Sequence, residues 1–112
     1  MSAAANALPK WAERVVAAHL AVCDRVSHGG RMNSDRYFVW QEDGAGALTG
    51  DDTHGEEGVT GTTDLFSKQE FDPWAQQIGA AFDAAGLAWY LNSVQFEEKT
   101  GFWHYEWVWE VA

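Results

Sequence analysis

The residues most able to do chemistry in this sequence are carboxylates, four histidines and one cysteine. His19 and Cys23 stand four residues apart within a helical pattern, a spacing that places two metal ligands on one helix face. A partly buried histidine and a buried thiol explain the same pair more simply. We therefore expect no metal site there, although metal binding stays open as an alternative.

Carboxylates are concentrated in residues 42–58, which hold six acidic residues, five glycines and no lysine or arginine. Their oxygen atoms suit a hard cation, but the spacing lacks the Asp-x-Asp/Asn-x-Asp/Asn-Gly pattern of a calcium loop. So polar a segment cannot form a core element, and we predict a long loop or an extended hairpin tip, of a length that tends to be functional or disordered. Its candidate site residues are Glu42, Asp43, Asp51, Asp52, Glu56 and Glu57. Weak divalent-cation binding at residues 51–57 is an alternative.

Catalytic motifs are missing from the sequence. There is no Gly-x-Ser-x-Gly elbow, no phosphate-binding glycine loop and no His-Glu-x-x-His pair. Glu97 and Glu98 are adjacent, and adjacent strand residues point to opposite faces, so the two carboxylates cannot act on one bond. We predict that the protein is not an enzyme and needs no cofactor.

Composition and charge narrow the function classes further. The 112 residues, 46% of them hydrophobic, suit one domain spanning residues 1–112. Seven basic and seventeen acidic residues give a net charge of −10. Residues 1–36 carry five bases and three acids (+2), whereas residues 37–112 carry two bases and fourteen acids (−12). So acidic a body repels nucleic acid, which excludes a conventional DNA or RNA reader.

The same sequence argues against a membrane protein or an exported one. No apolar run approaches the roughly 20 residues of a membrane span. Residues 1–10 have no signal-peptide pattern, so we expect no export. A single cysteine excludes an internal disulfide and indicates a reducing compartment.

Two helices and four strands must position these side chains. Pro9 suits the first turn of a helix, and Asp72-Pro73 is a strong start for a second helix that ends at Gly86. The predicted elements are a helix over 9–26, strands Tyr37–Trp40 and Val59–Phe66, the second helix, and strands Leu87–Phe96 and Phe102–Val111. The order predicts an α+β fold, α-β-β-α-β-β, in which two helices pack on one face of a mainly antiparallel four-stranded sheet.

The last strand alternates clearly between two kinds of face. One face is apolar throughout and is expected to meet the helices: Trp103, Tyr105, Trp107, Trp109 and Val111. The opposite face is mixed, and with apolar residues of the preceding strand it is unusually apolar for a solvent-facing surface. We therefore predict a protein interface there. Its candidate residues are Tyr90, Val94, Phe96, Phe102 and Val108.

Five short segments of the sequence resemble a family of small phage structural proteins. They are YFVWQEDG at 37–44, GTTDLFSK at 61–68, FDPW at 71–74, WYLNSVQFEE at 89–98 and HYEW at 104–107. Over residues 37–111 the sequence resembles the tail terminator, tail completion or minor capsid proteins of long-tailed bacteriophages. The resemblance implies a homo-hexameric ring in the virion, made in the host cytoplasm, that caps the tail tube, meets the head connector and lets DNA pass without binding it. It brings no catalytic residues.

Other functions fit the same sequence. A head–tail connector or stopper subunit is also a small ring-forming protein. A small acidic inhibitor, such as an immunity protein or antitoxin, would use its carboxylates to mask a basic partner. In the ring, the six acidic candidates of residues 42–58 would line the DNA channel, where repelled phosphates slide freely. In an inhibitor they would instead contact the basic partner.

Overall fold

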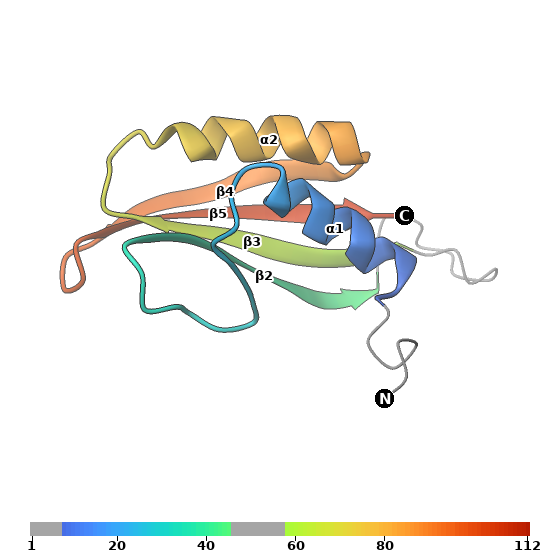
Figure 1. The fold of residues 1–112 in the computed structure, drawn as a ribbon, viewed down its shortest axis with the longest axis horizontal. Coiled ribbons are helices and arrows are strands. Elements are labelled where there is room, and N and C mark those ends of the chain that lie inside the picture. Colours follow the sequence, from blue (N-terminus) through green and yellow to red (C-terminus); the bar gives the residue numbers. More distant parts are fainter. Residues whose placement is uncertain (1–7, 46–57) are drawn as a thin grey trace.

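The chain forms a two-layer structure of two helices against one sheet (Figure 1), seen here in a computed structural model that describes residues 8–45 and 58–112. No helix in these ranges is long and apolar enough to cross a bilayer. The elements are α1 (Lys10–Leu20), β1 (Val26–His28), β2 (Arg36–Ala45), β3 (Val59–Ser67), α2 (Pro73–Ala85), β4 (Ala88–Glu97) and β5 (Phe102–Val111).

The sheet has five strands in the order β1-β2-β3-β5-β4. Strands β2, β3, β5 and β4 pair in antiparallel fashion, whereas β1 pairs with β2 in parallel. The predicted α+β class with two helices is confirmed. The predicted four-stranded antiparallel sheet is wrong in detail, because β1 makes the sheet five-stranded and mixed.

Strand β1 replaces the end of the predicted first helix. The helix stops at Leu20, and Val26 pairs with Phe38 of β2. Val22 and Val26 continue a helical spacing, yet both pack against the core from a turn and a strand. A turn followed by a short strand can bury apolar residues at the same spacing as a further helical turn. The spacing therefore predicted a helix that was too long.

Strand β2 is longer than predicted and takes up the start of the acidic segment. Of the two predictions for residues 42–58, a long loop or an extended hairpin tip, the hairpin fits the beginning of the segment, because Glu42, Gly44 and Ala45 pair with residues of β3. Their backbone groups complete the ladder while the acidic side chains stay in solvent. Residues 46–57 lie outside the described residues.

Large aromatic side chains fill the space between the sheet and the helices. Trp107 and Trp109 of β5 are almost wholly buried, at 2% and 1% exposure. Gly61 of β3 makes room for them, because a Cβ at that position would collide with the indole of Trp109. The predicted core face of β5 is confirmed at Tyr105, Trp107, Trp109 and Val111, which are all buried.

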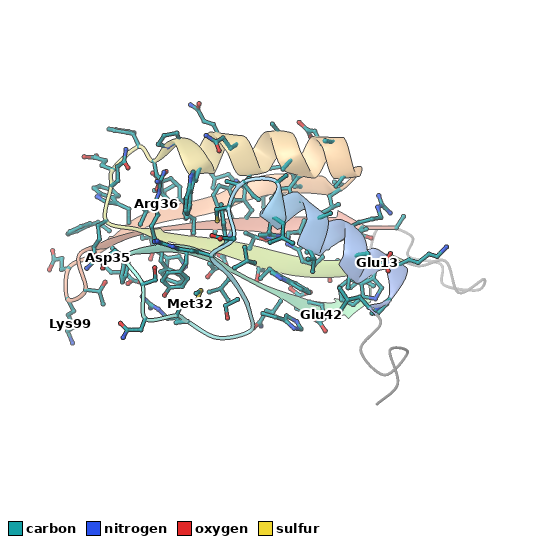
Figure 2. The ribbon with its side chains drawn as sticks, viewed as in Figure 1. Glu13, Met32, Asp35, Arg36, Glu42 and Lys99 are labelled. Carbon is teal, nitrogen blue, oxygen red and sulfur yellow. The ribbon has the colours of Figure 1, made fainter. Side chains whose placement is uncertain are left out.

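The start of α2 is fixed by one buried carboxylate. Asp72 accepts a hydrogen bond from the Trp74 amide at 2.8 Å, which caps the helix as predicted. It also accepts from Ser67 at 2.6 Å and pairs through both oxygens with Arg36, whose guanidinium stacks on Trp74. Burial alone would raise the pKa of Asp72, but these hydrogen bonds outweigh it and lower the pKa. Arg36 lies near the beginning of α2 in Figure 2.

His19 forms a second buried polar centre, in the middle of the core. Its Nδ1 lies 2.7 Å from the Val15 carbonyl and its Nε2 lies 2.8 Å from Thr63 Oγ1, which also accepts from the Trp109 indole. Burial lowers the pKa of His19 to about 4, against a smaller opposing effect of the Val15 carbonyl. The imidazole is therefore neutral at pH 7, and all its hydrogen-bonding groups have partners.

Replacing Asp72 with alanine is expected to lower the free energy of unfolding by about 3 kcal/mol or more, because it leaves Arg36 unpaired and α2 uncapped. Urea denaturation followed by tryptophan fluorescence measures the change. Glu70→Ala, an exposed acid in the same loop, is the control and should cost less than about 0.5 kcal/mol. Equal losses in the two variants would contradict the assigned role of Asp72.

Because the imidazole of His19 is buried, we expect a loss of stability in mild acid. Its pKa is lower in the folded chain than in the unfolded chain, so between about pH 6.5 and pH 4 the unfolded state binds more protons. The unfolding free energy should fall across this window with a slope approaching about 1.4 kcal/mol per pH unit. His19→Gln should remove that slope while lowering stability at pH 7. An unchanged slope in the variant would disprove the assignment.

Candidate interaction surface

One face of the sheet is covered by no helix of residues 8–45 and 58–112. Alternate residues of each strand point to it, and they are neighbours across the ladder: Val39, Asp64, Glu106 and Ser93 form one row, and Gln41, Thr62, Val108 and Tyr90 form the next. Both helices lie on the other side (Figure 1). We call the uncovered side the open face.

The predicted interface residues are divided between the two sides of the sheet. Tyr90 pairs with Val108 on the open face, and Phe102 contacts Tyr37 and Phe66 there. Val94 and Phe96 instead pair with Tyr105 and Trp103 on the helix side. The expectation of one shared face is wrong for these two residues.

A β-bulge explains the division. The register of β4 shifts between Leu91 and Ser93, so that Asn92 is an extra residue. One extra residue inverts the facing of every side chain beyond it. Val94 and Phe96 are nevertheless 44% and 48% exposed, because they lie on the edge strand.

The two acidic candidates that the structure describes, Glu42 and Asp43, point to different faces of the sheet. Glu42 bonds His28 at 2.8 Å, and His28 stacks on Trp40. Asp43 accepts a hydrogen bond from Thr60 Oγ1 at 2.5 Å. The other four candidates, Asp51, Asp52, Glu56 and Glu57, lie outside the described residues.

An ionic cluster occupies the hairpin end of the open face. His104 places Nε2 2.7 Å from Asp64 and Nδ1 3.1 Å from Glu97, so both ring nitrogens meet a carboxylate. Glu97 also pairs with Arg31 at 3.0 Å, and Arg31 lies over the ring of Phe66 at 4.0 Å. Only a protonated imidazole donates from both nitrogens. The hydrogen bond to Asp64 is the main cause of the raised pKa of His104, which burial opposes.

Two hollows lie on the open face. One, of about 240 Å³, is mostly apolar and includes Tyr90, Val108 and Ala88 in its wall. The other, of about 350 Å³, is polar and includes Asp64, Glu106 and His104. They follow each other along β5, so the open face offers an apolar position beside an acidic one.

The alternative of a metal site at His19 and Cys23 has no support in the geometry. Both nitrogens of His19 are engaged by the core, and the Cys23 thiol contacts the Arg25 carbonyl at 3.7 Å. Residues 8–45 and 58–112 hold no group of three or more histidine, cysteine or acidic side chains placed to bind a metal ion.

Sequence reasoning missed Arg31, Asp64 and Phe71. Arg31 lies in the loop between β1 and β2, and its pairing with Glu97 spans 66 positions, so no local spacing indicates it. Asp64 stands in an otherwise strand-like run and was interpreted only as part of a motif. Phe71 is 82% exposed with φ of 57°, an unusual combination for a bulky residue. Its place directly before Asp72-Pro73 was the available signal.

The charged contacts of His104 should stabilise the fold more at pH 6 than at pH 9. The pKa of His104 is raised in the folded chain. The contribution of these contacts to stability is therefore complete below about pH 6.5 and is lost as the pH rises through the pKa of the folded state. His104→Gln is therefore expected to lower the unfolding free energy more at pH 6 than at pH 9, as measured by urea denaturation. A loss that is the same at both values would contradict the charged bridge.

No protein-family model matches the chain, and no curated protein matches it significantly. The function of the open face and of the β4 edge therefore has to be argued from their own geometry and chemistry.

Proposed function

We propose that the protein is a structural subunit that associates with copies of itself into a ring, as the resemblance to phage tail terminator and tail completion proteins implies. In that role it caps a tail tube, joins it to a head connector and encloses a passage for DNA. The observation that carries the proposal is the apolar, nearly uncharged edge strand β4.

Exposed apolar side chains are concentrated at this edge. Of the eight large apolar side chains that the described residues leave exposed, four lie on β4: Tyr90, Leu91, Val94 and Phe96. Edge strands of monomeric proteins usually carry charges or prolines that prevent pairing. The one charged residue of β4 is Glu97, which Arg31 and His104 already neutralise. The one other feature of β4 that hinders pairing is the bulge at Asn92.

The opposite edge of the sheet offers a different apolar surface. A groove of about 370 Å³ lies between α1 and β1 and includes Leu8, Trp11, Val16 and Val26 in its wall. Contact between two unlike surfaces of the same protein is heterologous, and such contacts generate rings or filaments instead of closed dimers. Apolar side chains at one edge and an apolar groove at the other therefore favour a ring.

The net charge suits a passage for DNA. Six copies at −10 would carry a formal charge of −60. An acidic channel repels phosphate and holds no counterion-releasing contacts with it, so DNA slides through it.

Single charges introduced at either edge should abolish assembly. We expect Phe96→Asp and Leu8→Asp each to give monomers in analytical ultracentrifugation, under conditions in which the unmodified chain forms rings that negative-stain images show. Leu20→Asp is the matched control, because Leu20 is 56% exposed on α1 and lines neither surface. It should assemble normally.

Mixing the two variants tests the head-to-tail arrangement. Each retains one intact edge, so an equimolar mixture of Phe96→Asp and Leu8→Asp should form dimers and nothing larger. Dimers of Leu8→Asp alone would indicate a symmetric β4–β4 contact and contradict the ring. A monomeric unmodified chain at hundreds of micromolar would favour the acidic-inhibitor alternative.

A further inference from the structure

We propose that the open face is a docking surface for a basic segment of another protein. The segment would place an apolar side chain in the 240 Å³ hollow and a lysine or arginine beside Glu106. The proposal goes beyond self-association, since it involves the face of the sheet, although Tyr90 belongs both to this face and to the edge strand β4.

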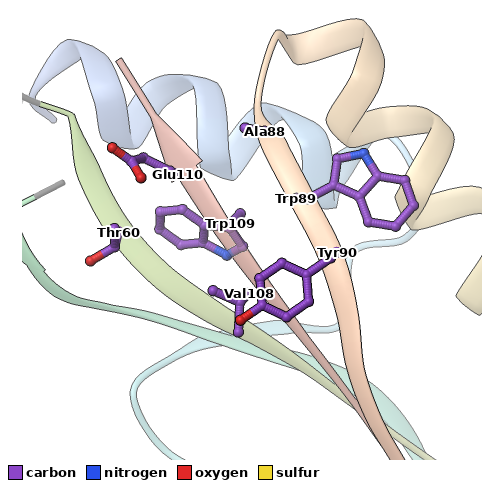
Figure 3. A pocket seen from close by; sticks show the side chains of 7 residues that line it. All are labelled: Thr60, Ala88, Trp89, Tyr90, Val108, Trp109 and Glu110. Carbon is purple, nitrogen blue, oxygen red and sulfur yellow. The ribbon is translucent and has the colours of Figure 1, made fainter. Parts of the chain in front are cut away.

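The apolar part of the surface is formed by Tyr90 and Val108. Figure 3 shows the Tyr90 ring beside Val108, while Trp89, one residue earlier, points toward α2. Tyr90 is 57% exposed and forms part of the wall of the hollow with Val108 and Ala88. Aromatic side chains in such positions are typical anchors of protein interfaces.

The acidic part lies one pleat further along β5. Asp64 and Glu106 are direct cross-strand partners on the open face, an arrangement that is unfavourable for like charges. Asp64 is bonded to His104, and Glu106 accepts a hydrogen bond from Asn92 at 3.0 Å. Both carboxylates line the 350 Å³ hollow. Because His104 already compensates Asp64, Glu106 is the carboxylate beside which a cationic side chain of the partner would lie.

His104 is the one basic side chain that the described residues of β2, β3, β4 and β5 direct to the open face, and Asp64 and Glu97 engage both of its ring nitrogens. Among the described residues, the side chains that β2, β3, β4 and β5 direct to the open face include no lysine or arginine. Arg31, from the loop between β1 and β2, also lines the 350 Å³ hollow, where Glu97 and Phe66 hold its guanidinium. The charge of this surface therefore favours a basic partner and excludes a nucleic acid.

The spacing of the two hollows defines the partner further. Glu106 and Val108 are two residues apart on β5, which is about 7 Å along a strand. Basic and apolar side chains match this distance at positions i and i+2 of an extended segment, or at i and i+4 of a helix, where the rise is about 6 Å.

The partner is a different chain, not a second copy. Four of the seven bases of this protein are already engaged within it: Arg14 by three carbonyl groups, Arg31 by Glu97, Arg36 by Asp72, and Lys68 by the Thr100 carbonyl. Among the other bases, Lys10 stands two residues from the exposed Leu8, but Leu8 lines the groove that the proposed ring contact covers, so this pair is not available to the open face of another copy.

Amphipathic peptides of known composition test the proposal by NMR titration. The probe is an 18-residue helical peptide with arginine and leucine at i, i+4 spacing, and its control is the same peptide with glutamate for arginine. The ¹⁵N-labelled protein carries Phe96→Asp to keep it monomeric, so that failure of assembly and failure of docking are separate results. We expect amide shifts at Thr62, Tyr90, Glu106 and Val108 with the arginine peptide only.

Variants on the open face sharpen the test. Glu106→Gln should weaken binding at least about fivefold at low salt, and the difference should shrink as salt screens the charges. Glu98→Gln removes the same charge from the exposed hairpin turn and should have no effect. The proposal is overturned if millimolar peptide leaves the open face unshifted, if both peptides bind equally, or if the two variants behave alike. If unlabelled protein, added in place of the peptide, shifts the amide signals of the open face, a second copy of the chain is the partner that occupies this face.

Discussion

The alternation of β5 is the constraint on which the rest of the structure depends. Trp107 and Trp109 lie beneath the helices, where they are the two largest of the fully buried side chains among the described residues. The alternation of the strand then directs Glu106 and Val108 to the open face, independently of the function of that face. The packing that holds the helices therefore also creates an open face of fixed composition.

Strand alternation and helix caps made much of the fold predictable from the sequence. The buried face of β5 and the start of α2 at Asp72 follow from local rules that act within a few residues. The bulge at Asn92 does not, because an extra residue leaves the alternation intact on both sides of it and changes only its phase. The sequence therefore assigned Val94 and Phe96 to the face opposite the one they occupy.

The ionic cluster could not be predicted for a different reason. Arg31, Asp64, Glu97 and His104 come from a loop, a central strand, the end of β4 and β5, so only the pairing of those strands brings them together. Long-range contacts of this kind have no sequence period. The same holds for β1, whose three residues gain their strand character from β2.

Charge determines where two copies of so acidic a protein can approach each other. At −10 per copy, most surfaces repel, and salt screens that repulsion only beyond roughly 8 Å. The exposed part of β4 has no uncompensated charge, and the groove at the other edge includes one carboxylate, Glu42, which is hydrogen-bonded to His28. The edges are thus where apolar contact meets the least repulsion, whereas the open face keeps its carboxylates. A sheet with few charges at its edges and carboxylates on one face can associate with copies through the edges and still present Glu106 to a basic partner.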